Sequence, residues 1–101
     1  MIDKYESRRI RADIRQVLLK VWDPIGVKDE PYAQDEYDGY LGDVFELLTS
    51  RASDDRIIEY LWQMVTEHMG LPSATMDDMR STVAALRQIK LPSGTQTDLP
   101  Q

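Results

Sequence analysis

The chain has 101 residues, 42% of them hydrophobic and 30% charged. This length is typical of one domain with a single hydrophobic core, and this composition argues against an intrinsically disordered chain. The absence of cysteine excludes disulfides and thiolate metal sites.

The net charge of −6 is unevenly distributed, with +3 over residues 1–22, −8 over residues 23–55 and −1 over residues 56–101. Non-specific nucleic-acid binding needs a dominant basic surface, so this balance argues against it. A charged partner is expected to be basic. The start of the chain lacks the apolar segment of a secretory signal, and no run approaches the roughly 18 apolar residues of a membrane helix. We therefore expect a cytoplasmic protein that does not bind membranes.

Apolar residues at helical spacing predict a first helix from about Asp3 to Val21. Its predicted inner stripe consists of Ile10, Ile14, Val17, Leu18 and Val21. Along one flank of this stripe lie Arg8, Arg11 and Arg15. We interpret them as a solvated or salt-bridged flank, because the acidic segment that follows does not suit a nucleic-acid surface.

The next segment is predicted to be a structural turn formed by Trp22, Asp23, Pro24, Ile25 and Gly26. Proline disfavours helical geometry in the residue before it, and Asp-Pro-Ile-Gly suits a β-turn. Ile25 and Val27 are expected to close the end of a helical bundle as apolar plugs.

A second helix is predicted from about Asp29 to Thr49, with Asp29 as its N-cap and Pro31 in its first turn. Its predicted inner face consists of Ala33, Tyr37, Tyr40, Leu41, Val44, Leu47 and Leu48. The opposite face is rich in carboxylates and carries two glycines in its middle; it consists of Asp35, Glu36, Gly39, Gly42, Asp43 and Glu46.

Capping signals predict a third helix that begins at Ser53 and ends at Gly70. Its expected inner face is Ile57, Tyr60, Leu61, Met64, Val65 and His68, with a second apolar flank of Ile58, Trp62 and Met69. A fourth helix follows Ser73 or Thr75, with Met76, Met79, Val83 and Leu86 on one stripe, and ends at Leu91-Pro92-Ser93-Gly94. We therefore predict an all-α fold, a compact antiparallel bundle of about four helices over residues 1–91, followed by a flexible tail over residues 92–101.

The sequence holds no recognisable catalytic motif, so we expect no catalytic residue and no enzymatic activity. The one histidine, His68, suits a packed or capping position near the end of a helix. Neither a nucleophile elbow nor a glycine-rich phosphate loop is present. An EF-hand register started at Asp35 places Tyr40 where glycine is required, and one histidine cannot build a di-iron site. We accordingly predict no metal site and no cofactor.

The two glycines of the second helix need an explanation, because an exposed glycine inside a helix costs about 1 kcal/mol relative to alanine. One interpretation is a kink at Gly39–Gly42 or close packing of another helix there. The other is that small residues within an acidic rim let a partner approach the backbone. The candidate partner-binding residues on this interpretation are Asp35, Glu36, Asp38, Gly39, Tyr40, Gly42, Asp43 and Glu46.

Three stretches resemble a family of short, uncharacterised bacterial all-helical proteins with a WDPIGV…EYD signature: Trp22 to Val27, Asp35 to Tyr40, and Met69-Gly70-Leu71. The resemblance covers about residues 8–71 and implies an all-helical bacterial domain. It carries no assigned activity, so it implies no functional residue. In size, charge and helicity the chain is also similar to immunity proteins that neutralise basic nuclease toxins, although it shows no motif of the colicin immunity family.

Our leading hypothesis is a non-enzymatic protein-interaction domain, most concretely a toxin-neutralising immunity protein. Its acidic second helix and the preceding turn would bind a basic partner, and Tyr32 or Tyr40 would supply contact area. One alternative is a small regulatory bundle that binds a divalent metal or a small molecule through the same carboxylates. Another is a structural homo-oligomer that hides Ile58, Trp62 and Met69 in its interface.

Overall fold

The computed structural model describes residues 3–27 and 29–91, and the predicted flexible tail over residues 92–101 lies outside them. The described chain is all-α, as predicted, with α1 at Lys4–Val17, α2 at Asp38–Thr49, α3 at Asp54–Gln63 and α4 at Arg80–Arg87. Two π-helical turns, Leu18–Trp22 and Met64–His68, extend α1 and α3, and 3-10 turns cover Pro31–Ala33 and Asp77–Met79.

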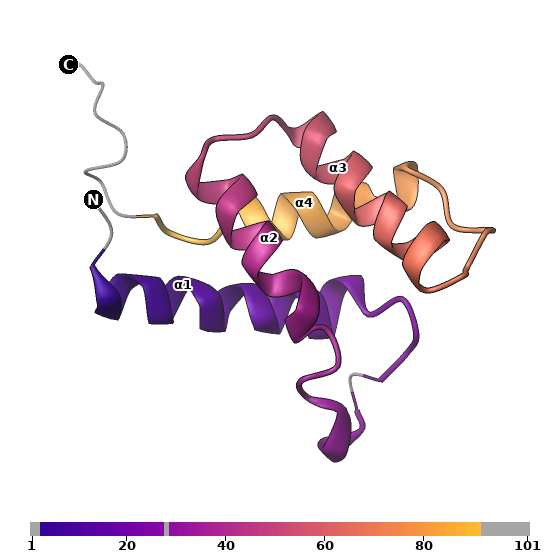
Figure 1. The fold of residues 1–101 in the computed structure, drawn as a ribbon, viewed down its shortest axis with the longest axis horizontal. Helices are drawn as coiled ribbons and strands as arrows, with labels where there is room; N and C mark the ends of the chain where they lie inside the picture. Colours follow the sequence, from indigo (N-terminus) through magenta and orange to yellow (C-terminus); the bar gives the residue numbers. More distant parts are fainter. Residues whose placement is uncertain (1–2, 28, 92–101) are drawn as a thin grey trace.

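The helices form the compact antiparallel bundle that the sequence predicts. In Figure 1, α4 runs back in the direction opposite to α1, α2 crosses α1 obliquely, and α3 lies beside α4. The segment between α1 and α2 projects from the bundle at the bottom of the view. None of the helices in the described ranges is long and apolar enough to cross a membrane.

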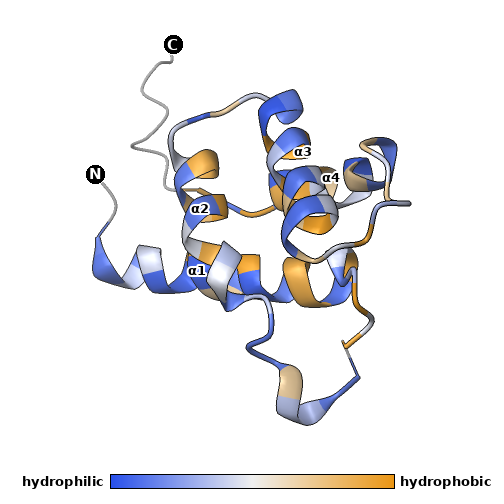
Figure 2. Cartoon of the chain, turned by 45° about the vertical axis from the view of Figure 1, so that its right-hand side comes forward, coloured by the Kyte–Doolittle hydropathy of each residue, from blue (hydrophilic) through white to orange (hydrophobic). Residues whose placement is uncertain are grey.

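The core lies where the helices face one another, and Figure 2 shows hydrophobic residues gathered there. Every helix contributes: the most deeply buried hydrophobic side chains are Ile10, Ile14, Leu18, Leu19, Val44, Leu48, Ile57, Leu61, Val65 and Leu86. Their burial removes apolar surface from water, which is the main favourable term in folding such a domain.

The π turn at the end of α1 corrects the predicted apolar stripe. Val21 was predicted to face the core, but it is 44% exposed, whereas Leu19 is 1% exposed and Trp22 7% exposed. A π turn contains one residue more per turn than an α-helix, so the following side chains are displaced around the axis by roughly one residue, about 100°. Trp22 therefore takes the core position that an unbroken α-helix would give to Val21, and Leu19 is buried beside it, while Val17, which precedes the π turn, still packs against the core.

The second helix begins at Asp38, nine residues later than predicted. Residues before it form a series of turns, with backbone hydrogen bonds from Glu30 to Val27, from Ala33 to Glu30 and from Glu36 to Ala33. Short helices in water depend on packing of an apolar face. The segment from Asp29 to Glu36 is polar apart from a few residues, so it has too little apolar surface to dock as a helix.

A turn over Asp23 to Gly26 follows the first helix as predicted, but Trp22, which was predicted to belong to this turn, ends the π-helical turn Leu18–Trp22. The amide of Gly26 donates to the carbonyl of Asp23 at 3.2 Å, and Gly26 has a φ of +71°, which glycine adopts without strain. Val27 packs against the core, but Ile25 is 43% exposed and does not plug the end of the bundle. The residue buried next to the turn is Tyr37, 3% exposed, whose hydroxyl accepts from the amide of Ile25 at 3.1 Å.

The caps of α3 and the start of the fourth helical segment are where the sequence predicts them, but α4 ends at Arg87, before the predicted end at Leu91. Ser53 accepts a hydrogen bond from the amide of Arg56 at 3.1 Å, and Gly70 has the left-handed φ of +68° typical of a helix C-terminus. Thr75 and Asp78 cap each other's backbone amides reciprocally, at 2.9 and 3.2 Å.

Two side chains near these caps are exposed, contrary to the predicted inner faces. His68 is exposed because the π turn Met64–His68 displaces it from the inner face of α3. Met76 is exposed because it precedes the first helical turn rather than lying within it.

Candidate functional site

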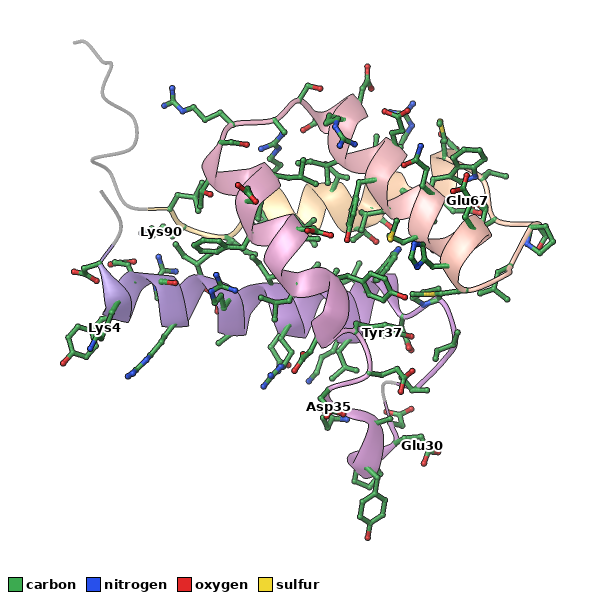
Figure 3. All side chains as sticks on the ribbon, viewed as in Figure 1. Lys4, Glu30, Asp35, Tyr37, Glu67 and Lys90 are labelled. Atoms are coloured by element: carbon green, nitrogen blue, oxygen red, sulfur yellow. The ribbon has the colours of Figure 1, made fainter. Side chains whose placement is uncertain are left out.

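The segment over residues 24–27 and 29–36, which we call the arm, projects from the bundle between α1 and α2 (Figure 3). Its base is closed by Tyr37, whose hydroxyl donates to the Asp23 carboxylate at 2.9 Å and accepts from the amide of Ile25 at 3.1 Å. Asp23 also accepts from the amide of Val27 at 2.7 Å. The ring of Tyr37 packs against Trp22 with 5.4 Å between ring centroids. The two ends of the arm are thus tied together and to the core.

Burial raises the pKa of Tyr37 above its ordinary value, and the Asp23 carboxylate that accepts its proton raises it further. The amide of Ile25 acts in the opposite direction but more weakly than burial. At neutral pH the hydroxyl therefore remains a donor, and the base of the arm keeps its hydrogen bonds.

The tip of the arm exposes one aromatic ring surrounded by carboxylates. Tyr32 is 96% exposed within the 3-10 turn, the highest value among the large hydrophobic residues that are exposed. Four exposed acidic residues lie around it along the chain, none of them in an ion pair with another described residue; they are Asp29, Glu30, Asp35 and Glu36. Glu30 and Asp35 extend from the arm in Figure 3. Asp29 and Glu30 were not among the predicted site residues, although the charge run that marked Asp35 and Glu36 includes them.

The structure divides the eight predicted site residues between the arm and α2. Asp35 and Glu36 are on the arm, whereas Asp38 begins α2 and pairs with Arg15, with nitrogen–oxygen distances of 2.9 and 2.5 Å. This pair raises the pKa of Arg15. Tyr40 is half-buried and meets the edge of Trp22 at 5.5 Å between centroids. Asp38 and Tyr40 therefore hold α2 against the bundle.

The remaining predicted residues lie along the outer side of α2. Asp43 accepts a hydrogen bond of 2.9 Å from the hydroxyl of Tyr60 on α3, and burial, followed by this bond, raises the pKa of Tyr60. Glu46, Gly39 and Gly42 are exposed. Glu46 is thus available to solvent, whereas Asp43 makes a hydrogen bond to α3.

The two glycines are not explained by packing inside the bundle. A Cβ atom built on Gly39 or Gly42 meets no atom within 4 Å, so no described helix packs closely there. α2 also continues as an α-helix through both positions. Gly39 is the second residue of α2, where helix propensity matters less, so Gly42 is the glycine whose presence most needs a reason.

Two findings in the described residues bear on the alternatives raised by the sequence. In residues 3–27 and 29–91, no three histidine, aspartate or glutamate side chains gather to hold a metal ion. The apolar flank expected to form an oligomer interface is covered within the chain: Ile58 is buried, Met69 packs against the core, and Trp62 donates to the carbonyl of Ala74 at 3.0 Å.

Comparisons with known proteins do not assign the chain. It matches no protein-family model, no curated protein and no solved structure. The resemblance to the family with the WDPIGV…EYD signature therefore stays a prediction, and function has to be argued from geometry.

Proposed function

We propose that the chain is a non-enzymatic protein-interaction domain that binds a basic partner protein through the arm, most concretely a toxin-neutralising immunity protein. The observation that carries the proposal is Tyr32, 96% exposed at the tip of the arm among exposed carboxylates. A tyrosine in this position buries little surface in the free chain, so its contribution to folding is small.

The chemistry of the tip suits binding to lysine and arginine. Tyrosine is among the residues that carry most of the energy in protein interfaces, because its ring buries a large area with few rotatable bonds. The carboxylates of Asp35 and Glu36 can accept charge-assisted hydrogen bonds and accelerate encounter with a positive surface. Together they provide an anchor and a charged rim.

The base of the arm supports this interpretation, since binding costs less free energy when the binding element is already ordered. Tyr37 and Asp23 tie the base of the arm together, and Trp22 connects it to the core. The partner would therefore meet an element whose ends are already in place.

The toxin-neutralising role is proposed because the expected partner is basic. An enzyme that cleaves nucleic acid presents a basic surface to the phosphate backbone. A small domain with a net charge of −6 and an acidic arm is suited to cover such a surface.

The test is affinity capture from the source cell at low salt with the unmodified chain and three variants of it. Tyr32→Ala removes the anchor, and the pair Asp35→Lys with Glu36→Lys reverses the rim. The matched control is Glu59→Lys with Glu67→Lys, which makes the same charge change at exposed positions on α3 and its π turn, where Glu67 is far from Asp35 in Figure 3.

A basic partner should be retained by the control and lost or strongly weakened by both arm variants, with binding of the unmodified chain falling as salt rises. Equal retention by all variants, or loss only in the control, would show that the arm is not the interface. Expression of the captured partner alone should arrest growth, and co-expression of the chain should restore it. Growth that is unaffected by the partner would contradict the immunity function while leaving the interaction intact.

A further inference from the structure

The second unusual surface is a hollow of about 390 Å³ between α1 and α2, which we call the arginine hollow. Its lining includes Arg8, Arg11 and Arg15 from α1 together with Ala12, Leu41 and Gly42. The volume is within the range of roughly 300–1,000 Å³ typical of small-molecule sites. It is separate from the tip of the arm, although Asp38, where α2 begins, also lines it.

The charges in the arginine hollow do not cancel. Arg15 is neutralised by its pair with Asp38, at 2.5 Å. Arg8 and Arg11 form no ion pair with any described residue. Two positive charges therefore remain in a protein whose net charge is −6. They would be balanced by a ligand that carries two negative charges.

Arg11 is held in position before any ligand arrives. Its guanidinium lies over the ring of Phe45 with 4.2 Å between Cζ and the ring centroid, and its Nε donates to the Ser7 hydroxyl at 3.3 Å. These two contacts orient the side chain, while its terminal N–H groups have no hydrogen-bond acceptor among the described residues. A planar guanidinium with free paired donors is well suited to phosphate oxygens.

Gly42 keeps the hollow open. It lies on the α2 side of the hollow, and a Cβ built on it meets no atom within 4 Å, so a larger side chain there would extend into free space. It also lines a neighbouring hollow of about 290 Å³ that includes Arg11 and Phe45. An open hollow would explain why position 42 is glycine, although glycine inside a helix lowers its stability.

From this geometry we infer a binding site for a small phosphomonoester with an apolar or aromatic group, which no other observation on this protein assigns. Arg8 and Arg11 would hold the phosphate dianion, and Ala12 and Leu41 would contact the apolar group. The inference is independent of the proposed partner at the arm, because the two use different side chains.

Titration of the full chain with phenyl phosphate at low ionic strength and pH above about 7, where the phosphate is doubly charged, tests this inference. Backbone amide shifts followed by NMR should saturate, with the largest changes around Arg11 and Gly42. Arg11→Gln should weaken binding about tenfold or more, because it removes a charge-assisted contact. Gly42→Leu should abolish binding by filling the hollow, and it should fold well because leucine favours helices more than glycine does.

Two matched variants keep the test specific. Arg56→Gln removes an exposed arginine of α3, and Gly39→Leu enlarges the neighbouring glycine of α2, which does not line the arginine hollow. Both should bind phenyl phosphate within about twofold of the unmodified chain.

Three results would overturn the inference: shifts that do not saturate, unchanged binding by Gly42→Leu, or equal weakening by Arg56→Gln and Arg11→Gln. Inorganic phosphate should bind more weakly than phenyl phosphate, and equal affinity would overturn the assignment of the apolar contact.

Discussion

The hydroxyl of Tyr37 donates a hydrogen bond of 2.9 Å to the carboxylate of Asp23, 14 residues earlier in the chain. This bond closes the arm at its base and joins the end of α1 to the start of α2. The same carboxylate accepts from the amide of Val27, so one side chain organises both the turn and the return of the chain. The orientation of the arm therefore depends on a small polar cluster next to the aromatic contact with Trp22.

Replacing Tyr37 by phenylalanine should lower the free energy of unfolding by about 1–2 kcal/mol, because the Asp23 carboxylate loses a donor and the amide of Ile25 loses an acceptor. Urea denaturation measures the loss, and faster hydrogen exchange at Ile25 and Val27 would locate it. The control Tyr32→Phe should change stability by less than about 0.5 kcal/mol, since Tyr32 is almost fully exposed. Equal effects of the two substitutions would contradict the role of the hydrogen bond.

Stability should fall at alkaline pH because burial raises the pKa of both Tyr37 and Tyr60 above the ordinary value of 10.0. Above pH 10 the unfolded chain releases protons that the folded chain retains. The contribution of these two tyrosines to the free energy of unfolding is complete below pH 10 and is lost as the pH rises toward their pKa values in the folded chain. Each tyrosine contributes a slope of up to about 1.4 kcal/mol per pH unit. Urea denaturation between pH 8 and 11 checks this.

Tyr60→Phe should make this alkaline slope shallower, because it removes one of the two tyrosines with a raised pKa. Tyrosinate absorbance of the folded chain should show that Tyr37 and Tyr60 ionise above the ordinary pKa of 10.0. A free energy of unfolding that is constant to pH 11 would contradict the raised pKa values.

The π turn at the end of α1 predicts that, of the apolar residues Leu19 and Val21, only Leu19 contributes strongly to the core. Leu19→Ala should cost about 2–5 kcal/mol, because it leaves a cavity in the core. Val21→Ala should cost less than about 1 kcal/mol, because Val21 is 44% exposed. Thermal or urea unfolding of the two variants measures both losses in the free energy of unfolding. The opposite order would show that α1 continues as a regular α-helix.

The glycines should respond in opposite directions to substitution by alanine. Gly42→Ala should raise stability by about 1 kcal/mol, since it improves helix propensity and meets no neighbouring atom. Gly70→Ala should lower stability by about 1 kcal/mol, because its φ of +68° is strained for any residue with a Cβ. Melting temperatures compare the two directly, and destabilisation by Gly42→Ala would indicate a close contact at α2.

The all-α class and the ends of most helices could be predicted from the sequence because they depend on local chemistry. Ser53 caps α3 with its own hydroxyl, Gly70 ends the helical stretch with its own backbone, and Asp23-Pro24 stops α1 within one turn. The start of α2 could not be predicted in this way. Asp29 and Pro31 are suitable starting residues, yet the segment after them has too little apolar surface to form a docked helix.

For the candidate site, the sequence showed that carboxylates gather between residues 29 and 46, but not which of them are available to a partner. Asp38 and Asp43 are committed to Arg15 and Tyr60, which are 23 and 17 residues away in the chain. The arginine flank of α1 was interpreted only as solvated or salt-bridged. Its position opposite Gly42 depends on the oblique crossing of α2, which no local pattern encodes.

The sequence by itself thus determined the helical class, the turn at Asp23 and the separation of charge, since these follow from spacing, capping and composition along the chain. Only the tertiary structure decided which acidic residues are exposed, that Leu19 and Trp22 rather than Val21 lie in the core, and that Arg11 and Gly42 line one hollow. Each of these depends on the angle and rotational phase at which two helices meet. That geometry is determined by packing across the whole core rather than by any one segment.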